Sequence, residues 1–164
     1  MTGKCRPNRV HRSAALAVFA IFLLFISSGF LEARSIPAVN KPLCDEAGVL
    51  DLKTKETIRQ ICFDIQYETS TEINVLIVRT TSGENHHDFT LRTFNNWGIG
   101  SARINNGMLI MFAIDDRRVE IVPGTRYIAF FDQPTCTKLL TDYVVPKMKA
   151  GKTSEGVIAA TREV

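Results

Sequence analysis

The chain has 164 residues, 45% of them hydrophobic, and its 20 basic and 17 acidic side chains leave a formal net charge of +3. Residues 1–33 hold four of the basic side chains and one of the acidic ones, so the remainder carries 16 of each sign and is neutral. A neutral body of about 130 residues forms one domain. Because its net charge is zero, long-range electrostatic attraction does not favour binding to nucleic acid or to an anionic membrane surface.

The first 33 residues have the layout of an export signal. A basic stretch over residues 4–12 precedes an apolar run from Ala14 to Ile26, and small residues follow. This order is typical of a secretory signal peptide, with cleavage after Gly29 or Ala33. An N-terminal signal anchor is the alternative, because the apolar stretch nearly reaches the roughly 17 residues of a short membrane span. We therefore expect a domain outside the cytosol, either secreted or attached by a single membrane span.

Three cysteines follow this segment, namely Cys44, Cys62 and Cys136, while Cys5 lies within it. In an oxidising compartment cysteines are expected to pair. Because three is an odd number, at most one intramolecular disulfide forms and one thiol remains. Sequence separation does not indicate which two residues pair.

The predicted elements follow a polar linker over residues 34–41, so the domain begins at residue 42. Residues 72–80 are almost continuously apolar and rich in β-branched side chains, as in a central strand covered on both faces. Apolar spacing, glycines and prolines indicate the other elements. They are an extended segment 42–45, helices 53–68, 87–97, 135–145 (ended by Pro146) and 154–164, strands 107–114 and 118–122, and an edge strand or helix start at 127–131.

The connections between these elements predict the topology. Strands 72–80 and 107–114 are joined through a helix, so they should run parallel with a right-handed crossover. Only Asp115, Asp116 and Arg117 separate strand 107–114 from strand 118–122, which predicts an antiparallel hairpin. The expected fold class is α/β: a mixed sheet of three to five strands flanked by helices on both faces.

A set of short motifs in this order resembles the TPM domain family over about residues 42 to 160. The motifs are Asp45-Glu46-Ala47-Gly48-Val49-Leu50, Trp97-Gly98-Ile99-Gly100, Asn105-Asn106-Gly107-Met108-Leu109-Ile110, Asp115-Asp116-Arg117-Arg118-Val119 and Gly124. The family includes thylakoid-lumen proteins of photosystem II repair, bacterial envelope proteins and a modulator of levamisole-sensitive acetylcholine receptors. The resemblance implies an exported or membrane-tethered sheet-and-helix domain. Some members bind calcium, and plant members are similar to acid phosphatases in activity.

Candidate metal ligands lie where a buried strand ends. Asp115 and Asp116 follow the predicted strand 107–114, and Asp45 or Asp132 joins them if the fold brings these segments together. Ca²⁺ takes several carboxylate oxygens of this kind, so we expect Ca²⁺ if any metal binds. The alternative is an ordinary hairpin turn, in which Asp bonds the local backbone and arginines offset its charge.

Other motifs point to structure more than to chemistry. His86 and His87 lack a third histidine in the exported part, and Cys62 lacks the phosphate-binding loop of a cysteine phosphatase. Asn105-Asn106-Gly107 is typical of a turn, with an anion site as the alternative. Trp97 is expected in the core, or on a partner surface if exposed.

The favoured function is therefore a non-catalytic interaction module. Its expected partner is a membrane or extracellular protein, for example a ligand-gated channel of the acetylcholine-gated kind, for which it would be an auxiliary modulator. One alternative is a metal-dependent acid phosphatase using Asp115 and Asp116, with Arg117 or Arg118 holding the phosphate. The other is a calcium-binding structural domain.

Overall fold

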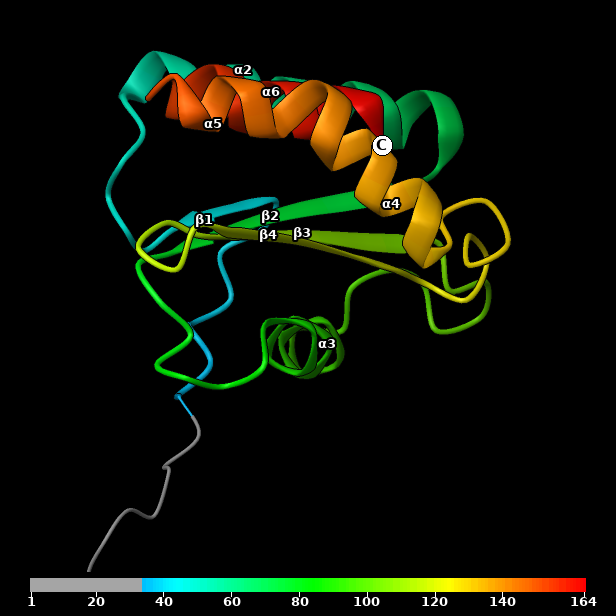
Figure 1. Ribbon diagram of the computed structural model, residues 1–164. Coiled ribbons are helices and arrows are strands. Elements are labelled where there is room, and N and C mark those ends of the chain that lie inside the picture. The colour runs from blue at the N-terminus through cyan, green and yellow to red at the C-terminus, as the bar shows by residue number, and fades with distance from the viewer. Residues whose placement is uncertain (1–33) are drawn as a thin grey trace, which may run out of the picture. The chain divides into compact units, whose positions relative to one another are not determined.

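The computed structural model describes residues 34–164, so the export signal expected in residues 1–33 lies outside the described part. A four-stranded mixed sheet forms the middle layer, and helices cover both of its faces (Figure 1). This arrangement confirms the predicted α/β class. None of the helices in residues 34–164 has the length and apolar character needed to cross a membrane.

The strands lie side by side in chain order. They are β1 (Leu43–Asp45), β2 (Glu72–Val78), β3 (Gly107–Ala113) and β4 (Arg118–Pro123). The first three are parallel and β4 is antiparallel to β3. The connections predicted the β2–β3 and β3–β4 pairings, whereas residues 42–45 were expected only to be extended. Every residue of β3 is buried, as are all residues of β2 after its first. Continuous apolar strands of this kind require cover on both faces, which the helices provide.

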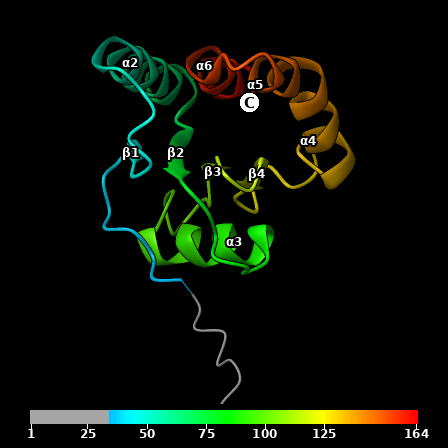
Figure 2. The same ribbon diagram turned by 60° about the vertical axis from the view of Figure 1, so that its left-hand side comes forward.

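One face of the sheet carries most of the helices, and α3 (His86–Trp97) covers the other (Figures 1 and 2). The first group consists of α2 (Leu52–Thr69), α4 (Gln133–Leu139), the π-helical turn η1 (Leu140–Val144), α5 (Val145–Lys149) and α6 (Thr153–Glu163). Local chemistry sets the ends: Asp51 accepts a 2.7 Å hydrogen bond from the amide of Thr54 at the start of α2. Gly98, with φ 57°, ends α3.

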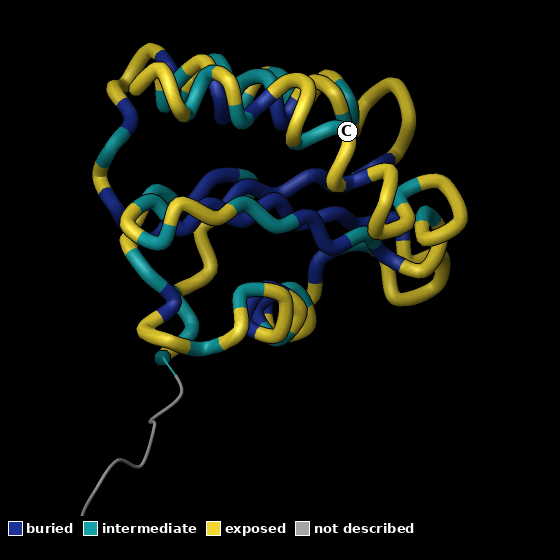
Figure 3. The backbone as a smooth tube through the Cα atoms, in the orientation of Figure 1, coloured by how far each residue is buried: buried dark blue, intermediate teal, exposed yellow. Residues whose placement is uncertain are grey.

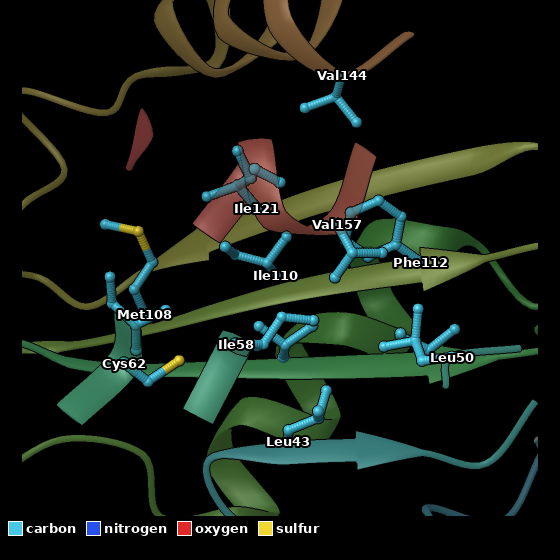
Figure 4. Packing of buried hydrophobic residues seen from close by; sticks show 14 of the residues in the cluster. Leu43, Leu50, Ile58, Cys62, Met108, Ile110, Phe112, Ile121, Val144 and Val157 are labelled. Atoms are coloured by element: carbon cyan, nitrogen blue, oxygen red, sulfur yellow. The ribbon is translucent and has the colours of Figure 1, made fainter. Parts of the chain in front are cut away.

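Alternation along the strands divides the core into two clusters. Val75, Ile110 and Phe112 pack toward α2 and α6, with Ile58 and Val157 facing them (Figure 4). Leu76, Leu109 and Met111 point the other way, toward Phe89 and Trp97 of α3. Figure 3 shows the result, with buried strands between helices whose outer surfaces are exposed.

Two predicted elements differ from the structure. Pro146 does not end the predicted helix 135–145; it lies in the first turn of α5, directly after η1. Proline has no N–H to donate and is tolerated in a first helical turn, where the wide π-helical turn resets the hydrogen bonding. Residues 127–131 form turns and neither a strand nor a helix, with the Phe131 amide donating to the Tyr127 carbonyl at 2.9 Å.

The expected disulfide is not formed. Cys44, Cys62 and Cys136 are all free and buried. Cys44 packs in the cluster beneath α3, whereas the other two pack in the cluster on the opposite face of the sheet. Cys62 belongs to α2, which packs on β1 and β2, and Cys136 belongs to α4 beside β4. The sheet therefore lies between Cys44 and the other two thiols, and the width of the sheet separates Cys62 from Cys136. Sequence position did not reveal this separation.

Candidate functional site at the carboxyl edge of the sheet

The parallel strands β1, β2 and β3 end at the same edge of the sheet. Asp45 is opposite Ile77, which is opposite Phe112, so Asp45, Thr81 and the Asp115–Asp116 pair all belong to this edge. In open α/β sheets the loops after strand carboxyl ends are the usual place for ligands. The predicted metal ligands thus come from the part of the fold where a site is expected.

Asp116 fastens the hairpin to the loop after β2. Its Oδ2 atom accepts hydrogen bonds from the Thr81 amide at 2.8 Å, the Thr81 hydroxyl at 3.3 Å and His86 Nε2 at 3.2 Å. The backbone hydrogen bond from Thr81 is the main reason that the pKa of Asp116 is lowered. This carboxylate therefore stays ionised at neutral pH while it accepts from two groups of Thr81, in the loop after β2, and from His86 at the start of α3.

Asp45 lies in a separate network on the α2 side of the sheet. Its side chain is only 2% exposed and contacts Lys55 Nζ at 2.9 Å. It also accepts from the amides of Val49 at 3.2 Å and Leu50 at 3.1 Å. Burial alone would raise the pKa of Asp45, but the hydrogen bonds from Lys55, Leu50 and Val49 together lower it. Asp45 thus closes the turn that leads into α2.

The three predicted metal ligands do not converge. Asp115 is exposed, and its Oδ1 lies 3.9 Å from Arg79, while its amide donates to the Arg79 carbonyl. Asp116 faces His86 on the α3 side, and Asp45 faces Lys55 on the α2 side. Within residues 34–164, no three His, Cys, Asp or Glu side chains are close enough to share a metal ion. Asp45, Asp115 and Asp116 therefore do not fit Ca²⁺ as one ligand set, and the metal remains a prediction.

An arginine-rich network beside Asp116 was not anticipated from the sequence. Arg34 donates to the Thr80 carbonyl and pairs with Glu46. Arg92 binds Glu84 through two hydrogen bonds of 2.7 and 3.1 Å, and both guanidinium groups lie within 5.7 Å of the Phe89 ring centre. Arg34 and Thr80 are 46 residues apart, so no local pattern marks this network.

The remaining candidate motifs serve the fold. Trp97 is 5% exposed and donates through Nε1 to the Pro37 carbonyl at 3.0 Å. Asn106 accepts from the Ser101 amide at 2.8 Å and so forms part of a turn. Burial raises the pKa of Cys62 to about 12, which keeps it a neutral thiol and a poor nucleophile. Residues 34–40 form no helix or strand, and the hydrogen bond from Trp97 to the Pro37 carbonyl holds this segment beside α3.

A groove of about 750 Å³ opens between β4 and the α4–η1–α5 segment. Its apolar walls come from both sides, and basic side chains lie among them. The lining includes Ile114, Arg117, Arg118, Val119, Ile121, Cys136, Leu140, Val145, Met148 and Lys149. Ligand pockets commonly have this size and this mixture of many apolar and few polar groups.

The loss of Asp116 should weaken the fold only where the carboxylate is charged. The lowered pKa means that its contribution is fully present above the unfolded value of about 4 and disappears as pH falls through the folded value. We expect Asp116→Asn to unfold at lower denaturant concentration than the parent at pH 7, with the difference shrinking below about pH 4. Asp64→Asn, on the exposed face of α2, is the control, and a difference that persists undiminished in acid would contradict this role.

A middle-layer sheet of four strands, helices on both faces and acidic residues paired at the carboxyl edge define this chain as a small α/β sandwich domain. The family model for the TPM domain matches residues 43–164, and the chain belongs to that family. The resemblance seen in the motifs is thereby confirmed.

Three solved structures from bacteria are similar to this chain. The N-terminal domain of a P. gingivalis protein has a TM-score of 0.68 and 25% identity, over 73% of this chain and 76% of that one. The N-terminal domain of cg2496 from Corynebacterium glutamicum has a TM-score of 0.61 and 15% identity, over 83% of this chain and 85% of that one. BA42 from Bizionia argentinensis has a TM-score of 0.61 and 20% identity, over 70% of this chain and 78% of that one. The last two show the fold alone, and no curated protein sequence matches the chain.

Proposed function

We propose that this TPM domain is an exported interaction module that binds a membrane or extracellular protein. The groove beside β4 is the observation that carries the proposal, because half-buried apolar walls and exposed cations lie on the surface there. Asp45 and Asp116 at the carboxyl edge, by contrast, are held by neighbouring side chains and amides. Such groups support the fold, whereas a groove with free polar and apolar surface supports binding.

The partner class comes from the export signal and the family. A domain delivered outside the cytosol meets the outer parts of membrane proteins, and a receptor modulator is among the family members that its motifs resemble. A ligand-gated channel, such as an acetylcholine-gated one, is therefore the first partner to test. In this role the domain contributes a surface, and no residue of it needs to act on a substrate.

Site-specific cross-linking from the native membrane tests this function. A photo-reactive residue at Thr141, which lines the groove, should attach the full chain to one integral membrane protein. The same residue at Glu68, exposed near the end of α2, is the control and should give no such product. Recovery of uncoupled monomer from both positions would overturn the proposal.

A second candidate, a weak Ca²⁺ site or a metal-assisted phosphatase, rests on Asp115 and Asp116 alone. These adjacent carboxylates follow β3, the exposed Asp115 keeps oxygens free, and His86 Nε2 lies 3.2 Å from Asp116. Ca²⁺ needs six to eight oxygen ligands, so water would have to complete the shell.

This candidate makes its own prediction. Millimolar Ca²⁺ should raise the melting temperature of the parent chain and leave that of Asp115→Asn unchanged, because a ligand that binds only the folded state stabilises it. Mg²⁺ at equal concentration controls for ionic strength, and phosphate release from a generic ester tests catalysis. An identical melting curve with and without Ca²⁺, together with no phosphate release, would remove this candidate.

A further inference from the structure

Strand β4 forms an edge of the sheet, and half of its backbone groups have no partner. The Gly124 amide donates to the Gly107 carbonyl at 2.8 Å, which sets the phase of the antiparallel ladder. In an antiparallel ladder every second residue directs its N–H and C=O groups toward the same neighbour, so the backbone groups of residues 122, 120 and 118 also face β3. Val119 and Ile121 therefore direct their N–H and C=O groups away from the sheet, and no other element in residues 34–164 pairs with them.

The groove lies along this same edge. The side chains of Val119 and Ile121 pack on the α2–α6 side, and Leu140 and Met148 face them from η1 and α5. Figure 2 shows the α4–η1–α5 segment passing beside β4, and Figure 4 shows Val144 opposite Ile121. Val119, Leu140 and Met148 all remain half-buried, so apolar surface is left uncovered next to unpaired backbone groups.

The charge along the groove is mainly positive. Arg117, Arg118 and Lys149 are exposed lining residues, and none has a carboxylate within 4.0 Å in the described part of the chain. The acidic lining residue Glu120 lies 3.9 Å from His87 Nδ1 on the α3 side of the sheet, and strand alternation directs Arg118 to the same side. Arg117 in the turn and Lys149 of α5 are therefore the cations that serve the groove. An occupant that carries negative charge would therefore complement the groove.

We propose that β4 accepts an extended segment of a partner protein as a fifth strand, and that this segment alternates apolar and acidic residues. Its backbone would pair with Val119 and Ile121, its apolar side chains would pack on Leu140 and Met148, and its carboxylates would meet Arg117 and Lys149. Strand addition is an established way of binding peptides at an open sheet edge. The proposal rests on the interaction-module function and names the surface and the kind of segment.

An extended peptide explains more of the groove than a small anionic amphipath does. Both would use the apolar walls and the cations, but only a peptide backbone satisfies the outward donors and acceptors of Val119 and Ile121. Unpaired backbone groups next to apolar surface bind water poorly, so pairing them is favourable. Pro123 follows them and has no N–H, which limits the open stretch to this part of β4.

A peptide titration followed by NMR tests the proposal on the ¹⁵N-labelled chain. The probe is a blocked synthetic peptide of alternating valine and glutamate, and the same peptide with lysine in place of glutamate is its control. We expect saturable binding of the glutamate peptide, slowed hydrogen exchange at the amides of Val119 and Ile121, and affinity about tenfold weaker or worse for the lysine peptide.

Two variants locate the contact. Arg117→Glu combined with Lys149→Glu should weaken binding of the glutamate peptide by about tenfold, while Lys53→Glu combined with Arg162→Glu, on exposed sites elsewhere, should not. Val119→Pro removes an N–H that faces away from β3, so it should abolish binding without breaking the ladder. If that variant fails to fold, the charge pair still decides the question.

Three results would overturn strand addition. Equal binding by the reversed-charge variant would show that the cations do not recognise the segment. If decanoate displaced the peptide and changed the chemical shifts of groove residues without slowing hydrogen exchange at the two amides, the groove would be assigned to small amphipaths. Protection that depends on protein concentration alone would assign β4 to pairing with a second copy. Each result is independent of the native cross-linking, so failure of one does not imply failure of the other.

Discussion

Gly107→Ala is expected to cost about 3 kcal/mol of unfolding free energy, the upper part of the usual range for overpacking. A Cβ atom at this position would lie 2.6 Å from the Ile99 carbonyl oxygen and 2.7 Å from the Gly100 amide nitrogen. These are backbone atoms that cannot rotate away. The loop after α3 would have to lift from the start of β3, where the two segments are in direct contact.

The control for this prediction is Gly48→Ala. Gly48 has φ +66°, and a Cβ atom there would have no neighbour within 4 Å. Alanine at this position is therefore destabilised only by the left-handed backbone conformation, which costs roughly 1–2 kcal/mol. Urea unfolding followed by circular dichroism compares the two variants. Equal losses would show that the contact between Gly107 and the loop is not the cause.

Asp45→Asn is expected to cost about 2 kcal/mol at neutral pH, a magnitude usual for a buried hydrogen bond to a charged group. The variant keeps the shape of the side chain but loses the ion pair with Lys55, and an amide group cannot accept from Val49, Leu50 and Lys55 as a carboxylate does. Asp45 is therefore predicted to act on stability, whether or not calcium is present.

The pH dependence provides a second check on Asp45. Its pKa is lowered in the folded state, so its stabilisation is complete above the unfolded value of about 4 and is lost as pH falls through the folded value. The gap between parent and variant should close in acid. A variant of unchanged stability whose only defect is a lost response to Ca²⁺ would instead make Asp45 a metal ligand.

The order and type of the main elements could be predicted because local patterns carry them. Continuous apolar runs mark β2 and β3, the short Asp115–Arg117 link marks a hairpin, and the helix between β2 and β3 requires them to be parallel. The TPM motifs could be read for the same reason, since most of them are turns next to these strands.

The prediction was weaker for the last helices. Pro146 is a reliable signal against a helix interior, yet η1 places it in the first turn of α5, where that signal does not apply. A π-helical turn of one extra residue has no clear sequence pattern. The path of residues 133–149, and with it the groove, depended on packing against β4 and α6.

The sequence by itself determined the sheet, its parallel core and the family, because these follow from the period and order of apolar residues along the chain. Only the tertiary structure decided which polar groups meet. Asp45 and Asp116 belong to the same edge yet face opposite sides of the sheet, and Arg34 reaches Thr80 from 46 residues away. The side on which a residue projects depends on strand phase and on the helix that covers it, and neither is encoded in the residue type.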